Sequence, residues 1–275
     1  MQYKFDEVNH LHSLDGKPLI GTSTVVNVLS KPLTWWAAGL AVEKLGWLKK
    51  VDPRKSTKEE IERNKQQREL KAEYALENIA KLHTDGEPEK YLALLDAAYR
   101  AHADSLNKSA DKGTDMHAEL EAYVKDCITH RGAPLTQILA GHEPVRIFAA
   151  WAYQNVKRFI VSEGHTYSER LWTGGITDCI AELKDGRMII IDFKSSKEAY
   201  FSQFVQVAGY DIEASENGIF DADGNLLLKL DKPIDGYVVF PFGAEKVEPQ
   251  FQFDTIGVRK GFEACVTLHK LINNN

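Results

Sequence analysis

The spacing of apolar residues is most regular in the second half of the chain. Residues 143–164 and 198–215 carry apolar residues at intervals of three and four, which predicts amphipathic helices. Residues 188–191 form an unbroken apolar run, which is typical of a buried strand. The same reading gives helices at 111–128 and 257–272 and strands at 166–172, 175–183, 187–194, 235–242 and 247–253. This mixture predicts an α/β (α+β) core with a small mixed sheet.

The N-terminal part of the chain has a different character. Residues 8–21 predict a hairpin that turns at Asp15-Gly16, and Ser23 is expected to cap a short helix that ends before Pro32. A second helix is expected over 34–48. Residues 49–110 are rich in Lys, Arg, Glu and Gln with thinly spaced apolar positions, which indicates long, mostly solvated helices. We therefore expect an N-terminal hairpin and helical arm or lid over 1–110, and a core over 111–275.

Composition narrows the class of protein. The chain has 275 residues, 43% hydrophobic and 27% charged, which is typical of a soluble globular protein. No apolar stretch approaches the roughly 20 residues of a membrane span, and the N-terminus lacks a signal-peptide pattern. We expect a cytoplasmic protein, or one in the host cytoplasm if it is phage-encoded, with no membrane partner. The net charge of −6 argues against a protein that coats nucleic acid through bulk charge.

Cysteine usage excludes several kinds of site. The three cysteines, Cys127, Cys179 and Cys265, are far apart and form no CxxC pair. A disulfide framework, a structural zinc site and an iron–sulfur cluster are therefore not expected. We interpret the three as buried free thiols.

The predicted hairpin over 175–194 carries the most informative polar residues. Asp192 and Lys194 follow the apolar run and point to one face of a strand, because side chains repeat every two residues. Asp178 lies on the partner strand. Two carboxylates on adjacent strands can hold a hard cation such as Mg²⁺, and a lysine beside them can position water or stabilise phosphate charge. The alternative is an edge strand with a surface salt bridge.

Two predicted helices add candidate groups. His117 and Glu121 are four residues apart, so they share one helical face. Gln203, Gln206 and Tyr210 also fall on one side of a helix, where an amide and a phenol could hold a phosphate or a metal-bound water. Both sets have an alternative interpretation as polar stripes on exposed helices.

The ordered motifs resemble those of the PD-(D/E)XK nuclease superfamily, in particular the RecB-type branch that includes phage and mitochondrial genome-maintenance exonucleases. They are Gly113-x₃-His117-x₃-Glu121, Gly174-Gly175-x₂-Asp178, Asp192-Phe193-Lys194-Ser195-Ser196 and Gln206-x₃-Tyr210. The resemblance covers residues 111–240, with a looser likeness at the N-terminus. It implies a restriction-endonuclease-like αβββαβ core and metal-dependent hydrolysis of DNA.

The resemblance also implies roles for single residues. Asp178 and Asp192 would bind Mg²⁺ or Mn²⁺, as one or two ions, with His117 as a further ligand and the Phe193 carbonyl completing the shell. Lys194 would orient the attacking water, and Gln206 and Tyr210 would contact the scissile phosphate. Glu121 would bind a second ion or orient His117, and Glu169 is a lesser candidate.

The chain departs from the family pattern in two ways. Asp192 stands where glutamate is commoner, which shortens the reach to the metal. The four-cysteine cluster of some relatives is missing, so the fold is expected to close by packing, with the helix over 257–272 as a candidate.

Contacts with DNA are expected from groups near the metal site and from the arm. Ser195, Ser196, Lys197 and Arg170 flank the site, and Lys49, Lys50, Arg54, Lys55 and Lys58 gather at the start of the arm. Trp35 and Trp36 could stack on unpaired bases, with core packing as the alternative.

The arm suggests a DNA exonuclease that acts from a free single-stranded end in recombination, repair or replication, although the arm could equally bind a recombination or replication protein. The alternatives are a structure-specific or restriction-like endonuclease and a catalytically idle DNA-binding or assembly module.

Overall fold

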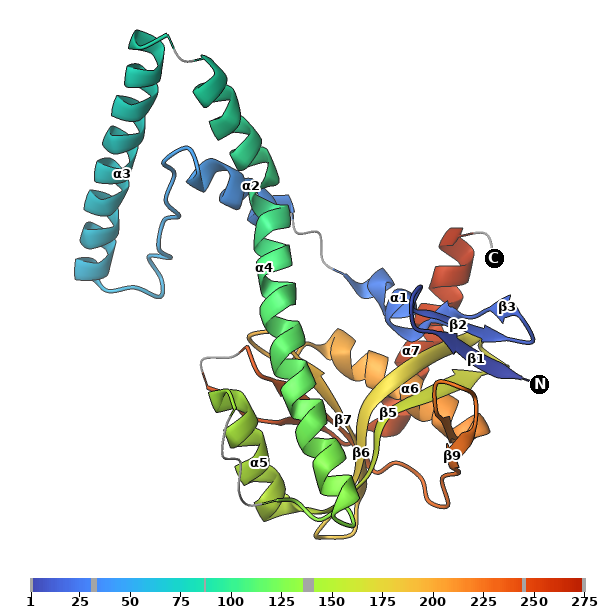
Figure 1. Cartoon of the computed structure of the whole chain (residues 1–275). Coiled ribbons are helices and arrows are strands. Elements are labelled where there is room, and N and C mark those ends of the chain that lie inside the picture. Colours follow the sequence, from blue (N-terminus) through green and yellow to red (C-terminus); the bar gives the residue numbers. More distant parts are fainter. Residues whose placement is uncertain (1, 31–33, 87, 136–140, 244–245, 274–275) are drawn as a thin grey trace. The chain divides into compact units, whose positions relative to one another are not determined.

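The computed structural model describes residues 2–30, 34–86, 88–135, 141–243 and 246–273, which form two compact units (Figure 1). Unit 1 combines the N-terminal segment Met1–Ser30 with the chain from Lys112 onward, and unit 2 covers Lys31–Asp111. The N-terminal segment thus folds with the core, whereas the sequence pattern grouped it with the helical arm.

Unit 1 is built on one mixed sheet, as the sequence predicts. Its strand order is β11-β10-β7-β6-β5-β8-β9, and β4 pairs with β6 outside this path. The strands are β4 (Ile20–Gly21), β5 (Val156–Ser168), β6 (Thr173–Leu183), β7 (Met188–Lys194), β8 (Ile219–Phe220), β9 (Leu226–Leu228), β10 (Gly236–Pro241) and β11 (Gln250–Gln252). The central strands β5, β6 and β7 run antiparallel to their neighbours in this series, while β10 runs parallel to β7.

Helices cover both faces of this sheet (Figure 1). One face packs against α1 (Thr22–Val26), α6 (Phe201–Asn217) and α7 (Thr255–Asn273), and the other against α5 (Glu143–Asn155) and the last part of α4 (Pro88–Thr129). The alternation of β7 divides the two cores, because Ile190 faces α6 while Ile189 and Ile191 face α4 and α5. This explains the unbroken apolar run: the strand is buried on both faces.

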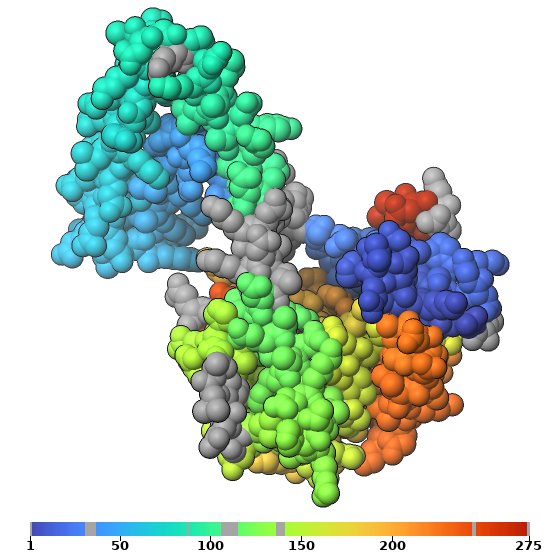
Figure 2. Space-filling view, viewed as in Figure 1, coloured from blue at the N-terminus to red at the C-terminus, as the bar shows by residue number. Residues whose placement is uncertain are grey.

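The N-terminal strands explain why the segment up to Ser30 belongs to unit 1. Strands β1 (Tyr3–Asp6), β2 (Leu11–Leu14) and β3 (Lys17–Pro18) form a small sheet, with the predicted turn at Asp15-Gly16. Tyr3 and Leu14 are buried against Tyr167 of β5. The N-terminal residues lie against the β8–β9 segment (Figure 2), where Phe5 N–H donates to the Ala222 carbonyl at 3.4 Å.

The structure corrects several predicted boundaries. The helix expected over 143–164 ends at Asn155, and β5 begins at Val156 because residues 156–161 are mostly β-branched or aromatic and β6 supplies ladder partners. Residues 169–172 form a turn rather than a strand. Ser23 does not cap α1, whose N-cap is Gly21. The helix expected to begin at residue 111 is the last part of the continuous helix α4, whereas the expected division of the chain there agrees with the unit boundary at Asp111 and Lys112.

The three cysteines are buried and free, as interpreted from the sequence. Cys127 and Cys179 lie in the core beside α4 and α5, and Cys265 lies in the core beside α6 and α7. Because α7 packs its apolar stripe onto α6, the C-terminal helix closes unit 1 by hydrophobic burial.

Unit 2 is helical, as predicted. It contains α2 (Thr34–Glu43), α3 (Lys58–Thr84) and the first part of α4, and the loop before α3 is exposed and basic. A capping box between Thr57 and Glu60 begins α3. The side of α3 opposite its partly buried residues carries a run of carboxylates, Glu59, Glu62, Glu69, Glu73 and Glu77. None of the helices in the described part of the chain combines the length and hydropathy of a membrane span.

Candidate active site

The β6–β7 hairpin opens into a polar site where its backbone ladder ends. Cys179 and Ile191 form the last ladder pair at this end, so Asp178 and Asp192 come next and stand opposite each other. Asp178 Oδ2 accepts a hydrogen bond from the Phe193 N–H at 2.6 Å. Just beyond the last ladder pair, the Asp178 side chain thus replaces a backbone acceptor, and this hydrogen bond holds its carboxylate beside Asp192.

Asp192 and Lys194 share one face of β7, as their spacing predicts. The Lys194 Nζ lies 2.8 Å from Asp192 Oδ1 and 2.7 Å from Oδ2. Phe193 points to the opposite face, where its ring packs edge-on against Phe148 and Phe240. This packing holds Phe193 on the face of β7 opposite to Asp192 and Lys194.

Asp192 is a buried carboxylate, with 1% of its surface exposed. Burial raises the pKa of Asp192 to about 6, against the opposing effect of the Lys194 charge. Burial also acts to lower the pKa of Lys194, but the charges of Asp192 and Asp178 prevail and raise it. Despite its closeness to Nζ, Asp192 Oδ2 lacks a partner with hydrogen-bond geometry. A buried carboxylate oxygen therefore has unused capacity to bind a cation.

His117 reaches this site from α4. Its position one turn before Leu120 places it on the stripe with Leu120, Val124 and Cys127 that packs on the sheet. The ring meets Phe193 edge-on, and Nε2 lies 3.2 Å from Asp178 Oδ1. The hydrogen bond with Asp178 raises the pKa of His117 above its ordinary value. The structure thus brings His117, Asp178, Asp192 and Lys194 together at one end of the sheet.

Glu121 lies beside a carboxylate that the sequence pattern did not reveal. Glu163 stands between the ladder pairs Ser162–Cys179 and Gly164–Thr177, which places it opposite Asp178. Lys125 Nζ binds Glu163 Oε2 at 2.7 Å and also pairs with Glu121, whereas the contacts described for Glu121 do not include His117. The sequence pattern predicts a helix over 143–164, which would not place Glu163 beside the strand that carries Asp178, whereas the structure forms β5 there.

The backbone of Glu163 adopts an unusual conformation. Its φ is 50°, in the left-handed region that residues other than glycine rarely adopt. Such strain persists only where surrounding structure enforces it, and it concentrates at functional sites. Glu163, which faces Asp178 in the strand register and binds Lys125, is therefore a candidate member of the site.

Tyr210 and Gln206 line the site from α6. The Gln206 amide donates to the Tyr210 hydroxyl. Burial, with the nearby charges of Asp192 and Asp178, raises the pKa of Tyr210, so its phenol stays protonated. Gln203 instead binds Ser196 Oγ and the Tyr200 N–H at the start of α6.

The residues expected to bind nucleic acid fall into two groups. Ser195, Ser196 and Lys197 directly follow Lys194, so they lie at the same end of the sheet. Arg170 does not flank the site: it pairs with Glu216 and Glu263, and Glu216 is about 15 Å along α6 from Gln206. Glu169 is exposed in the same turn as Arg170. The side chains of Trp35 and Trp36 lie outside the described residues.

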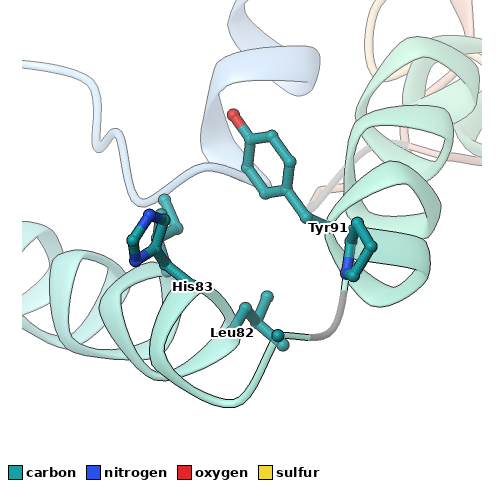
Figure 3. A pocket seen from close by; sticks show the side chains of 6 residues that line it. Leu82, His83 and Tyr91 are labelled. Atoms are coloured by element: carbon teal, nitrogen blue, oxygen red, sulfur yellow. The ribbon is translucent and has the colours of Figure 1, made fainter.

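A separate hollow in unit 2 lies where α3 is followed by α4 (Figure 3). It has a volume of about 400 Å³, and its lining residues are Ile79, Leu82, His83, Gly86, Pro88 and Tyr91. Because these side chains are mostly apolar, we assign no chemistry to this hollow.

The side chains at the end of the sheet are of the types that bind a hard cation, but they do not converge on one point. Among the described residues, no three His, Cys, Asp or Glu side chains are close enough together to hold a metal ion. Asp192 accepts a hydrogen bond from Lys194 Nζ, and Asp178 accepts one from the Phe193 N–H. Asp178 and the buried Asp192 supply carboxylate oxygens, which are the ligands that Mg²⁺ and Mn²⁺ prefer.

No family model matches the chain, and no curated protein matches it significantly.

Proposed function

We propose that this protein is a metal-dependent deoxyribonuclease that hydrolyses phosphodiester bonds. The observation that carries the proposal is the meeting of Asp178, Asp192 and Lys194 at the open end of β6 and β7, with Asp192 buried. An ordinary surface salt bridge would not require a carboxylate with 1% exposure.

The order of elements supports a restriction-endonuclease-like core. Helices α4 and α5 precede β5, β6 and β7, and α6 is followed by the short strands β8 and β9 and then by β10, which runs parallel to β7. This succession agrees with the αβββαβ order that the motif resemblance implies. The four motifs also lie on the elements expected of them: a helix, two adjacent strands and a following helix.

Asp178 and Asp192 would hold Mg²⁺ or Mn²⁺, with His117 Nε2 and the Phe193 carbonyl as further ligands. The bound cation would supply Lewis acidity toward a phosphate oxygen and lower the pKa of a water. The Lys194 amine, kept charged by its carboxylate neighbours, would orient that water and stabilise phosphate charge. The neutral Tyr210 phenol, fixed by Gln206, would donate to the phosphate.

The resemblance of the motifs to the RecB-type branch favours an exonuclease that acts on DNA with a free single-stranded end, in recombination, repair or replication. Unit 2 provides exposed basic residues, among them Lys49, Lys50 and Arg54, for binding the strand or a partner protein. An endonuclease with the same core remains the second candidate, since fold does not decide between the two. An idle DNA-binding module is less well supported, because each motif position keeps a chemically competent residue.

The test is cleavage of end-labelled single- and double-stranded DNA in Mg²⁺, Mn²⁺ or chelator. We expect metal-dependent shortening from one end and no action on a covalently closed circle. Cleavage of the circle would identify an endonuclease. Absence of cleavage on every substrate with either metal would overturn the proposal.

A further inference from the structure

A cavity of unit 1 extends away from the candidate active site. It has a volume of about 460 Å³ and is bounded by the N-terminal hairpin, the segment 19–24 and the start of β6, and it reaches Tyr210. We call it the hairpin cavity. Its lining residues are Phe5, His10, Leu11, His12, Leu19, Ile20, Gly21, Thr22, Ser23, Thr24, Gly174, Gly175, Ile176 and Tyr210.

The cavity and the proposed catalytic groups share a wall. Tyr210 lines the cavity, and its hydroxyl group accepts the hydrogen bond from Gln206 near the aspartates. Along β6, Gly175 precedes Asp178 by three residues, or about 10 Å. The hairpin cavity therefore lies beside the strand that carries Asp178, with Tyr210 next to both.

Two glycines set the shape of this wall. A Cβ at Gly175 would lie 2.4 Å from Tyr210 Cε1 and 2.9 Å from Thr22 Oγ1, and one at Gly174 would lie 3.0 Å from His12 Cβ. Only glycine lets the hairpin and Tyr210 approach β6 this closely. The Gly174-Gly175 motif thus shapes the part of the cavity lining that is next to Tyr210.

The chemistry of the lining selects a neutral ring system. Among the described residues that line it there is no lysine, arginine, aspartate or glutamate. A phosphate would find no counter-charge there. The half-buried Phe5 ring, the apolar side chains Leu11 and Ile176 and the exposed imidazole of His10 instead offer surfaces for a flat heterocycle.

Free hydroxyls complete the site. In the described structure, the exposed Ser23 and Thr24 hydroxyls are not engaged by other protein groups, so they can donate to or accept from a ligand. The volume lies within the range of small-ligand sites. On the basis of the proposed nuclease function, we infer that the hairpin cavity binds the nucleoside of the terminal nucleotide. Its base would lie against Phe5 and His10, with its phosphate directed toward Asp178 and Lys194.

The test uses the full chain carrying Lys194→Ala, so that DNA is bound and not consumed. The probes are short single-stranded oligodeoxynucleotides in Mg²⁺, either complete or abasic at the first or the last nucleotide. We expect loss of the base at one end to weaken binding about ten-fold, since stacking of one base contributes that much. The end that matters identifies the end that enters the cavity.

A variant that fills the cavity then assigns the effect. Thr24→Trp, added to the Lys194→Ala chain, should lower affinity for the complete probe and reduce the abasic penalty to less than about two-fold. The matched control is Asn27→Trp, which places the same ring on an exposed residue outside the lining. Thermal unfolding of both variants verifies that they fold.

The outcomes separate the two proposals. If the Thr24→Trp chain folds, binds DNA and keeps the full abasic penalty, the hairpin cavity is not the base site, and the nuclease proposal is unaffected. If neither abasic probe binds more weakly than the complete one, the inference is also wrong. If the wild-type chain neither binds nor cleaves any DNA, the proposed function fails, and this inference fails with it.

Discussion

Asp178 Oδ2 accepts the backbone N–H of Phe193 at 2.6 Å, while its other oxygen lies 3.2 Å from His117 Nε2. One carboxylate therefore connects β6, β7 and α4 at the end of the sheet. Its orientation is fixed by the fold before any cation or substrate arrives, which is what a preorganised site requires.

Replacement of Lys194 should stop cleavage. Lys194→Ala removes the amine that faces both aspartates, so we expect the rate of DNA cleavage to fall by at least about 100-fold, as for loss of one electrostatic catalytic group. The measurement is single-turnover cleavage of end-labelled DNA. The control is Lys184→Ala, an exposed lysine at the other end of the same hairpin, which should retain the wild-type rate. A Lys194→Ala rate within about three-fold of wild type would contradict the assigned role.

Binding of Mn²⁺ should depend on the ionisation of Asp192. Because burial raises its pKa to about 6, the carboxyl is mostly protonated at pH 5 and mostly ionised at pH 7.5. A cation needs the ionised form, so the rise in unfolding temperature on adding Mn²⁺ should be small at pH 5 and larger at pH 7.5. Differential scanning fluorimetry measures both. Asp192→Asn should show little shift at either pH, and an unchanged wild-type shift between the two pH values would oppose this prediction.

Glu163 combines backbone strain with a place beside Asp178. Glu163→Gly should relieve the left-handed conformation and raise the free energy of unfolding by about 1 kcal/mol, while it lowers the cleavage rate. Glu163→Gln keeps the side-chain shape and isolates the loss of charge. Urea unfolding and cleavage assays test both variants. If Glu163→Gln cleaves at the wild-type rate, Glu163 has only a structural role with Lys125.

Glu213 should make the stability of unit 1 depend on pH. Its carboxylate is buried and accepts hydrogen bonds from Thr22, Thr166 and Thr173, yet burial raises its pKa from 4.5 to about 7. The folded state therefore binds a proton that the unfolded state releases between these pH values. Its stabilising contribution is complete below pH 4.5 and is lost as pH rises through 7.

The measurement is the free energy of unfolding at pH 5 and pH 8 in chelator. Wild type should lose more stability over this interval than Glu213→Gln, by at most about 3 kcal/mol. Glu77→Gln, on the exposed side of α3, should behave like wild type. Equal losses in wild type and Glu213→Gln would show that Glu213 does not titrate in this range.

The basic start of the helical unit should bind DNA through phosphates. The double variant Lys49→Gln, Lys50→Gln should weaken binding of single-stranded DNA and reduce the slope of log K against log salt by about 1 to 1.5, since each phosphate contact contributes roughly 0.7. Fluorescence anisotropy at several salt concentrations measures this slope. Lys229→Gln, Lys232→Gln is the matched control on an exposed loop of unit 1. An unchanged slope would show that Lys49 and Lys50 do not contact phosphates, and it would favour binding of a partner protein by unit 2.

The sequence by itself determined the local features. The apolar run at 188–191 fixed a buried strand, period-two alternation placed Asp192 and Lys194 on one face, and Asp15-Gly16 fixed a hairpin turn. Each depends on short-range geometry, in which a side chain's direction follows from its position in the strand or turn. The mixed sheet followed from the order of these elements.

Only the tertiary structure decided which distant residues meet. Residues 156–164 have an apolar pattern that suits a helix or a strand, and pairing with β6 selected the strand and so exposed Glu163 as a neighbour of Asp178. The N-terminal segment joined unit 1 because Tyr3 and Leu14 are buried against Tyr167, which lies far from them along the chain. Such long-range burial leaves no periodic mark in the sequence, which is why the hairpin cavity was not predicted.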